Sequence, residues 1–214
     1  MEPLEEGCFY HIYNRGAGKS DLFFTDNDFR LFIDKYFFYL NISAETYCWC
    51  LLKNHFHILL RVRKLNEQKT LFQQIKNNYP EGTFYGDHFD QTKPFLASKQ
   101  FSHLMNSYTK SVNTKTSRSG TLIEGTFKRK RIKNKNHFNH LVCYIHRNPI
   151  HHKITENYSD YLYSSFHAYL DSSNQKQHSY LEKKKVLTQF GGIDNFLKAH
   201  EEFKLLLGEE YYLE

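Results

Sequence analysis

The segment from Glu45 to Arg63 constrains the fold of this chain most strongly, because it has the pattern of a β-hairpin. Aromatic and aliphatic residues fill "ETYCWCLL" and "HFHILLRVR", and only Lys53 and Asn54 separate the two runs. A connection this short joins neighbouring antiparallel strands in a tight turn. The chain is therefore expected to build an antiparallel sheet around this hairpin.

Strands and helices alternate on both sides of the hairpin. Before it, "CFYHIYNRG" predicts a strand, and Asp26 can cap a helix whose apolar residues recur at helical spacing. After it, the periodicity fades from Lys64 to Gln100, which predicts a loop or insertion. Next, "FSHLMNSYTKSVN" predicts a helix, "SGTLIEGTFKRKRI" a strand, and "NHFNHLVCYIHRN" a helix that Pro149 interrupts. The C-terminal part adds a polar linker, "DSSNQKQHS", and two helices separated by a Gly-Gly pair.

The order of these elements, β-α-β-β, loop, α-β-α, predicts an α+β fold. A ferredoxin-like antiparallel sheet with helices on one face is the arrangement that fits it, followed by a helical C-terminal extension. We expect a first domain over residues 1–150, in which 64–100 is the loop or insertion, and the extension over 151–214.

Composition narrows the functional class. The formal net charge of +6 favours a nucleic-acid partner, although many basic proteins bind none. The four cysteines contain no CxxC pair, so neither a disulfide framework nor a structural zinc site is indicated. The N-terminus has no apolar leader and no apolar run reaches the length of a membrane span. We therefore expect a cytoplasmic, nucleoid-associated protein with no membrane association.

Two histidines of the hairpin are candidate metal ligands. Side chains alternate across a strand, so Phe56 and Ile58 belong to an apolar face, whereas His55 and His57 share the opposite, mostly polar one. Two imidazoles about 7 Å apart at Cα can converge on one cation. The alternative is that both histidines lie on a solvated sheet face, and the spacing alone does not decide between them.

The helix around Tyr144 offers a candidate nucleophile. Tyr144 and Asn148 are four residues apart and lie on one helical face, away from the apolar stripe. A phenol beside basic and amide groups can act as a nucleophile. The alternatives are an ordinary amphipathic tyrosine and an asparagine that caps a following helix before Pro149.

A basic run, "KRKRIKNK", follows Phe127 and contains no acidic residue. Such a run neutralises phosphates, although it can also be a solvated surface. The apolar Phe127 and Ile132 suggest an ordered strand that holds the cations in place. The candidate DNA-binding residues are Lys128, Arg129, Lys130, Arg131, Lys133 and, from the tyrosine helix, Arg147.

These elements, in this order, resemble the HUH-type Y1 transposases of the IS200/IS605 class, in the branch related to REP-associated tyrosine transposases. The matching stretches are "FYHIYNRG", "LLKNHFHILL", "FSHLMNSYTKSVN", "GTLIEGTFKRKRI" and "LVCYIHRNPIHHKI". Each motif is weak by itself, whereas HxH followed by YIHxNP is specific. The match runs from Cys8 to Leu170, interrupted after Lys64.

The resemblance implies an enzyme that cuts and rejoins single-stranded DNA through a covalent 5′-phosphotyrosine. His55 and His57 match the metal-binding histidines and Tyr144 the nucleophile. Asn148 stands where related enzymes place a third ligand, often Gln. Mg²⁺ or Mn²⁺ is the implied metal, although imidazole ligands by themselves favour Zn²⁺ or Mn²⁺. The implied partners are single strands with hairpin or repeat ends. The relatives include homodimers, some of which exchange the tyrosine helix, as well as monomers, so the sequence leaves the assembly state open.

Two other functions are weighed against this one. A relative could keep the fold and bind repeat DNA without cutting it. A metal-dependent hydrolase of small phosphates would explain neither the basic run nor the tyrosine.

His140 and Arg147 are further candidates for a supporting role around the nucleophile.

Overall fold

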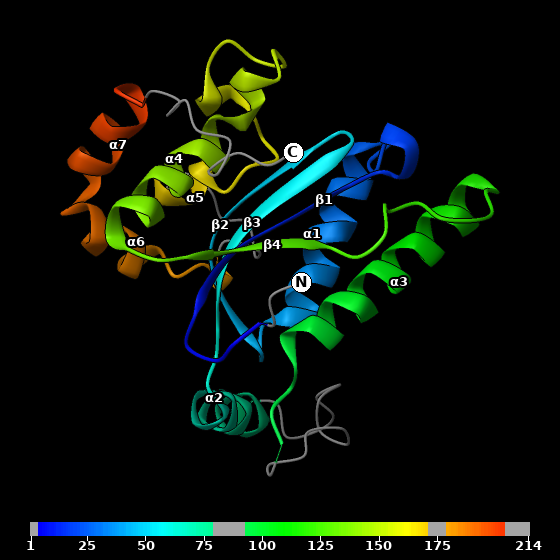
Figure 1. Cartoon of the computed structure of the whole chain (residues 1–214), viewed down its shortest axis with the longest axis horizontal. Helices are drawn as coiled ribbons and strands as arrows, with labels where there is room; N and C mark the ends of the chain where they lie inside the picture. Colours follow the sequence, from blue (N-terminus) through cyan, green and yellow to red (C-terminus); the bar gives the residue numbers. More distant parts are fainter. Residues whose placement is uncertain (1–3, 79–92, 171–178, 204–214) are drawn as a thin grey trace.

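The computed structural model describes residues 4–78, 93–170 and 179–203. In this part of the chain, four antiparallel strands form one sheet in the order β2-β3-β1-β4 (Figure 1). The strands are β1 (Phe9–Arg15), β2 (Ala44–Leu52), β3 (His55–Val62) and β4 (Lys128–Ile132). The hairpin of β2 and β3 and the strand order confirm the predicted ferredoxin-like sheet.

The register of the strands separates two chemically different faces. Tyr13 pairs with His57 and His11 with Leu59, so these four side chains lie on the same face. Ile12 pairs with Ile58 on the other face. A slip of one residue would exchange the two faces, so burial of the apolar face fixes where the histidines point.

Helices α1 (Asp26–Leu40) and α3 (Ala97–Thr116) cover the apolar face, as predicted (Figure 1). Phe32 of α1 packs on Phe56 and Tyr108, with ring centroids 5.0 and 5.1 Å away. A capping box between Thr25 and Asp28 begins α1, because each side chain satisfies a backbone N–H of the first turn. The main hydrophobic core therefore lies between this face of the sheet and the helices α1 and α3.

Helix α4 (Lys135–His151) lies across the histidine face, packed mainly on β2 (Figure 1). The expectation that Pro149 would interrupt this helix is wrong, because α4 continues to His151. Proline in the last turn removes one backbone bond near a helix end that frays in any case. The alternative role of Asn148 as a cap is wrong too, since it lies inside α4 and is fully buried.

The stretch predicted as a loop or insertion, 64–100, contains a helix. Helix α2 spans Leu65–Asn78, and α3 begins at Ala97. Phe72 and Gln68 are the buried residues of α2. Residues 79–92 of the predicted loop lie outside the described part of the chain.

The C-terminal segment closes the free edge of β2. Ser164 forms a bridge with Cys50, and the backbone N–H of Leu51 donates to the carbonyl of Tyr163 at 2.9 Å. Pairing of this kind protects an edge strand from other chains. The helices that follow are α5 (Phe166–Tyr169), α6 (Lys183–Phe190) and α7 (Ile193–Glu201). Most of the predicted linker lies outside the described residues, and the predicted C-terminal helices are α6 and α7.

Within residues 4–78, 93–170 and 179–203, no helix has the length and apolar character needed to cross a lipid bilayer.

Candidate active site

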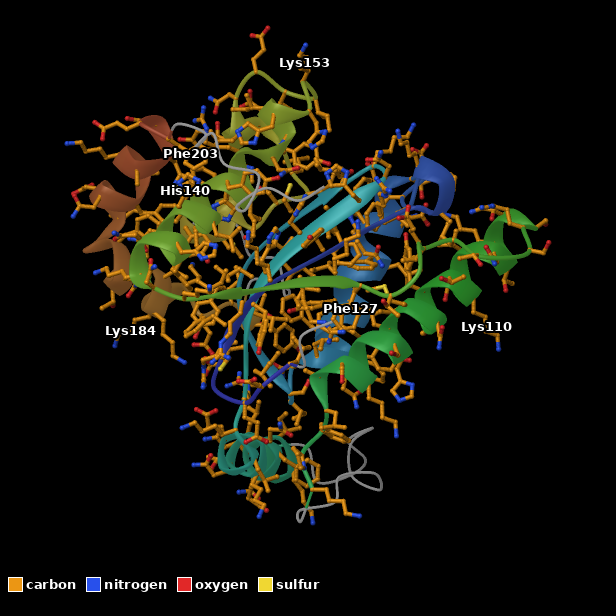
Figure 2. The ribbon with its side chains drawn as sticks, in the orientation of Figure 1. Lys110, Phe127, His140, Lys153, Lys184 and Phe203 are labelled. Atoms are coloured by element: carbon orange, nitrogen blue, oxygen red, sulfur yellow. The ribbon has the colours of Figure 1, made fainter. Side chains whose placement is uncertain are left out.

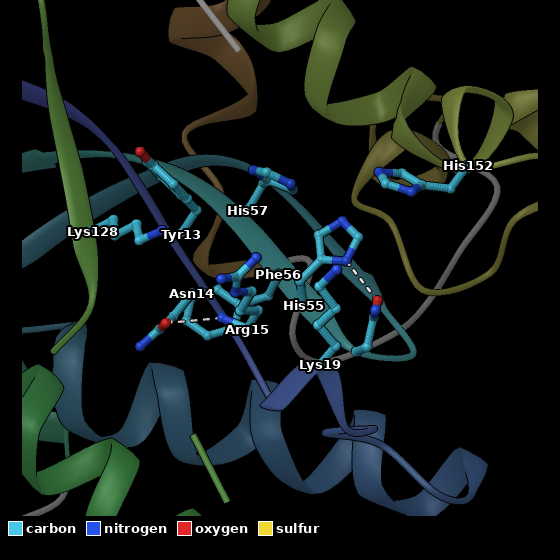
Figure 3. Close-up of a pocket in the computed structure, with 10 residues that line it drawn as sticks. Tyr13, Asn14, Arg15, Lys19, His55, Phe56, His57, Lys128 and His152 are labelled. Carbon is cyan, nitrogen blue, oxygen red and sulfur yellow. Dashed lines mark hydrogen bonds between the residues drawn. The ribbon is translucent and has the colours of Figure 1, made fainter. Parts of the chain in front are cut away.

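A cleft of about 250 Å³ opens where β1 ends and β3 begins (Figure 3). His55 and His57 of β3 and Tyr13 of β1 line it, and His152 approaches from beyond the end of α4 (Figure 3). The other lining residues are Asn14, Arg15, Lys19, Asn54, Phe56 and Lys128. Imidazoles and basic side chains together make a lining suited to a phosphate group.

His55 is oriented by the turn residue that precedes it. Its Nδ1 lies 2.7 Å from Oδ1 of Asn54, and its Nε2 lies 3.3 Å from Oδ1 of Asn148. Both amide oxygens can only accept, so the nitrogen that donates is set by the tautomer of the ring. When Nδ1 donates to Asn54, Nε2 is the nitrogen that can ligate a metal, and Oδ1 of Asn148 lies beside it.

His57 is 1% exposed and is held by a second histidine. Nε2 of His11 lies 2.9 Å from Nδ1 of His57, whereas Nε2 of His57 has no hydrogen-bond partner among the described residues. Burial lowers the pKa of His57 well below its ordinary value, and the charge of a protonated His11 would lower it further. His57 is therefore neutral at physiological pH, which is the protonation state that a metal ligand requires.

Tyr144 of α4 lies over this pair of histidines and is 3% exposed. Its ring centroid is 5.7 Å from that of His57 and 6.3 Å from that of His11. One helical turn later, Asn148 reaches His55. Amphipathic packing of α4 thus brings Tyr144 and Asn148 to the two histidines within a single chain.

Several residues of the cleft were not among the predicted ones. His152 packs against His55 in a tilted arrangement with ring centroids 4.6 Å apart, and the ring centroid of His151 lies 5.5 Å from that of Tyr144. The sequence signal for His151 and His152 is the His-His pair after Pro149. It becomes informative only once α4 is known to extend to His151. His11 and Asn54 were hidden because their partners depend on strand register and turn geometry.

The donor set at the site can be compared with what a divalent metal needs. Among the described residues, no three His, Cys, Asp or Glu side chains are grouped so that they could hold a metal ion. The predicted set contains two imidazoles and one amide, and its chemistry fits a cation. Nε2 of His57 is a buried, unpartnered nitrogen, and Nε2 of His55 and Oδ1 of Asn148 offer lone pairs.

Strand β4 divides the basic run between the two faces of the sheet. Lys128 pairs with Tyr13 and lines the cleft, and Lys130, two residues on, lies on the same face. Arg129 and Arg131 point to the other face. The guanidinium of Arg129 lies over the ring of Phe127, 4.7 Å from its centroid, and that of Arg131 forms an ion pair with Glu5 at 2.8 Å. Lys133 is exposed just after the strand.

Arg147 and His140 contact the C-terminal part of the chain. Nη1 of Arg147 donates to the backbone carbonyl of His200 at 2.7 Å, and its guanidinium lies 5.2 Å from the Tyr158 ring centroid. His140 packs on Phe203 with ring centroids 4.7 Å apart, and burial lowers its pKa to about 4. Both side chains therefore help to hold the C-terminal segment against α4.

Comparisons with known proteins relate this fold to a solved structure. No protein-family model matches the sequence, and no curated protein matches it. The chain is similar to a REP-associated tyrosine transposase bound to a REP hairpin, with a TM-score of 0.56 and 17% sequence identity. The similarity covers 83% of this chain and 88% of that one. The chain therefore has the fold of that transposase.

Proposed function

We propose that this protein is a DNA nicking and joining enzyme of the Y1 transposase type, with Tyr144 as its nucleophile. One observation carries the proposal: Tyr144 lies 5.7 Å from His57 across the interface between α4 and the sheet, measured between ring centroids. The shared fold with a tyrosine transposase bound to a DNA hairpin supports it. Because tyrosine and histidines come from one chain, a homodimer is not required to assemble the site.

The reaction is a substitution at phosphorus. The phenolic oxygen of Tyr144 attacks a phosphodiester of single-stranded DNA, and the bond from phosphorus to the 3′ oxygen breaks. The protein keeps a 5′-phosphotyrosine, and the released strand ends in a 3′-hydroxyl. Attack of a 3′-hydroxyl on the phosphotyrosine reverses the step, so strands are joined without an external energy source.

The phenol must lose its proton during attack, since its ordinary pKa is about 10. An imidazole that is not assigned to the metal can accept that proton, and His151, whose ring centroid lies 5.5 Å from that of Tyr144, is the neighbour that fits this role. The 3′ oxygen takes up a proton as it leaves. Exclusion of water by α4 strengthens these electrostatic interactions.

The residues that would hold a divalent cation are His55, His57 and Asn148. When bound there, Mg²⁺ or Mn²⁺ would polarise the scissile phosphate and neutralise its developing charge. Lys128 and Lys19 line the same cleft and position the phosphates of the strand on either side.

A covalent-adduct assay tests the proposal. The protein is incubated with a library of hairpin-bearing single strands and Mn²⁺, and we expect a protein–DNA adduct that survives SDS. Tyr144→Phe should abolish the adduct because it removes the attacking oxygen. Tyr39→Phe, on α1 and away from the cleft, is the matched control and should retain it.

A repeat-DNA-binding protein that does not cut is the second candidate, favoured by the burial of Tyr144. A phenol that is 3% exposed reaches a phosphate only after α4 or the segment beyond it moves. Binding of hairpin strands with no adduct in Mg²⁺, Mn²⁺ or Zn²⁺ would establish this second function and overturn the first.

A further inference from the structure

A second cavity, of about 360 Å³, lies on the same side of the sheet at the other end of α4. We call it the aromatic pocket, after Phe9, Tyr47 and Phe138 in its lining. Its rim carries Lys133 and Lys135, where β4 passes into α4. The cavity is within the size range of small-ligand sites, and the mechanism proposed above does not use it.

The three rings form a preorganised apolar floor. Their centroids are 5.2 Å apart for Phe9 and Tyr47, 5.6 Å for Phe9 and Phe138, and 5.4 Å for Tyr47 and Phe138. Tyr47 and Phe138 are buried, whereas Phe9 is half-buried and offers ring surface to the cavity. A planar aromatic ligand can stack on such a surface.

The charge of the rim selects an anionic ligand. Lys133 and Lys135 are exposed, and their ammonium groups can turn toward the opening. A third lysine of the lining, Lys185, forms ion pairs with Glu45 at 2.7 Å and Glu182 at 3.3 Å, so its charge is already compensated. A ring for stacking and two lysines for phosphate are the two components of a single-strand binding site.

The aromatic pocket and the active-site cleft lie along the same face of β4. Lys128 lines the cleft, Lys130 follows on the same face, and Ile132 lines the pocket. The five residue-to-residue steps of extended chain from Lys128 to Lys133 span roughly 17 Å. With about 3.4 Å between stacked nucleotides, that distance suits about five of them, or fewer in a stretched strand.

We propose that the aromatic pocket binds an unpaired nucleobase of the same single strand whose scissile phosphate lies in the cleft. The base stacks on Phe9, and Lys133 and Lys135 hold the phosphates beside it. This inference rests on the proposed function for the identity of the strand, but it concerns binding rather than cleavage.

Binding measurements on an uncut strand test it. The Tyr144→Phe protein is titrated with a fluorescent strand that forms the adduct with wild-type protein or, where none does, with the tightest-binding strand. Single abasic sites are placed in turn along the unpaired part. We expect one position at which loss of the base weakens binding on the order of tenfold. In the protein that also carries Phe9→Leu, an abasic site at that position should no longer weaken binding, because the half-buried ring on which the base stacks has been removed.

A charge variant keeps the test valid if Phe9→Leu perturbs the fold. Lys133→Ala with Lys135→Ala should lower the slope of log affinity against log salt by about 1.4, since each single-strand phosphate contributes about 0.7. Lys110→Ala, on the outer side of α3 (Figure 2), is the matched control and should leave the slope unchanged.

The outcomes separate this inference from the proposed function. An adduct that forms normally, with uniform abasic penalties and an unchanged salt slope, would overturn the pocket and leave the enzyme intact. A Phe9-dependent abasic penalty without any adduct would keep the pocket and remove the enzyme.

Discussion

His11 and His57 are joined across neighbouring strands by a contact of 2.9 Å between Nε2 and Nδ1, below the ring of Tyr144. The contact occupies one nitrogen of His57 and leaves the other as an unpartnered buried atom. A histidine whose second nitrogen is held in this way has a fixed ring orientation. His11 therefore acts as a positioning residue for His57.

The first prediction concerns this positioning role. His11→Ala should weaken Mn²⁺ binding about 10- to 100-fold, the usual effect of removing a group that orients a metal ligand. The binding of Mn²⁺ can be followed by its electron paramagnetic resonance signal in the absence of DNA. His103→Ala, on the exposed face of α3, is the control. Unchanged Mn²⁺ affinity in His11→Ala would show that His11 does not orient a ligand.

The second prediction is a loss of stability in mild acid. Burial lowers the pKa of His200 to about 4 and that of His11 to about 3, so the folded protein keeps both rings neutral where the unfolded chain binds protons. The unfolded state then binds more protons, and the free energy of unfolding falls as the pH drops below about 6.5. The contribution of His200 alone is on the order of 3 kcal/mol by pH 4.

Urea denaturation at a series of pH values between 7 and 4 measures this dependence. His200→Gln should flatten it, because glutamine does not titrate and can still hydrogen-bond. A free energy of unfolding that stays constant between pH 7 and pH 5 in the wild-type protein would contradict the prediction.

The elements that the sequence predicted correctly are those whose signals are local. The hairpin, α1, α3 and α4 bury apolar residues at regular spacing, so each pattern is visible without the rest of the fold. Helix α2 was missed because its inner face includes a polar residue. Gln68 is fully buried, donates to the carbonyl of Arg63 at 3.1 Å and accepts from the N–H of Phe95 at 2.8 Å. An amide at a buried position interrupts the helical spacing of apolar residues by which an amphipathic helix is recognised in a sequence.

The candidate site was likewise predictable only where its sequence signals are local. The strand pattern placed His55 and His57 on one face of β3, and the family resemblance implied that Tyr144 meets them. The structure brings the three side chains together, with Tyr144 buried although the helical pattern placed it away from the apolar stripe of α4. The His11 contact depends on the pairing of β1 with β3, which no local pattern shows. The whole basic run was predicted to bind DNA. Strand alternation, however, sends Arg129 and Arg131 to the opposite face of the sheet from Lys128.

The third prediction concerns Ser165, which connects β2 to α4. Its buried hydroxyl accepts from the N–H of Trp49 at 2.9 Å and contacts Nε2 of His146 at 2.8 Å. Ser165→Ala removes both buried contacts and should lower the free energy of unfolding by about 1–3 kcal/mol. Chemical denaturation measures the change, and Ser102→Ala on the exposed side of α3 should have almost no effect. Equal stabilities for the two variants would rule out this network as a stabilising contact.

The last prediction separates the structural role of an arginine on α4 from the DNA contact proposed for a lysine on β4. Arg147 donates to the carbonyl of His200 near the end of α7, where a cation is favoured by the helix dipole. Arg147→Met should therefore speed amide hydrogen exchange in α7 while leaving the salt dependence of DNA binding unchanged. Lys128→Ala should do the reverse, lowering the slope of log affinity against log salt by about 0.7 because one phosphate contact is lost. If Arg147→Met lowers the slope instead, the arginine contacts DNA, as the sequence predicted, and its contact with His200 is exchanged for a phosphate when the strand binds.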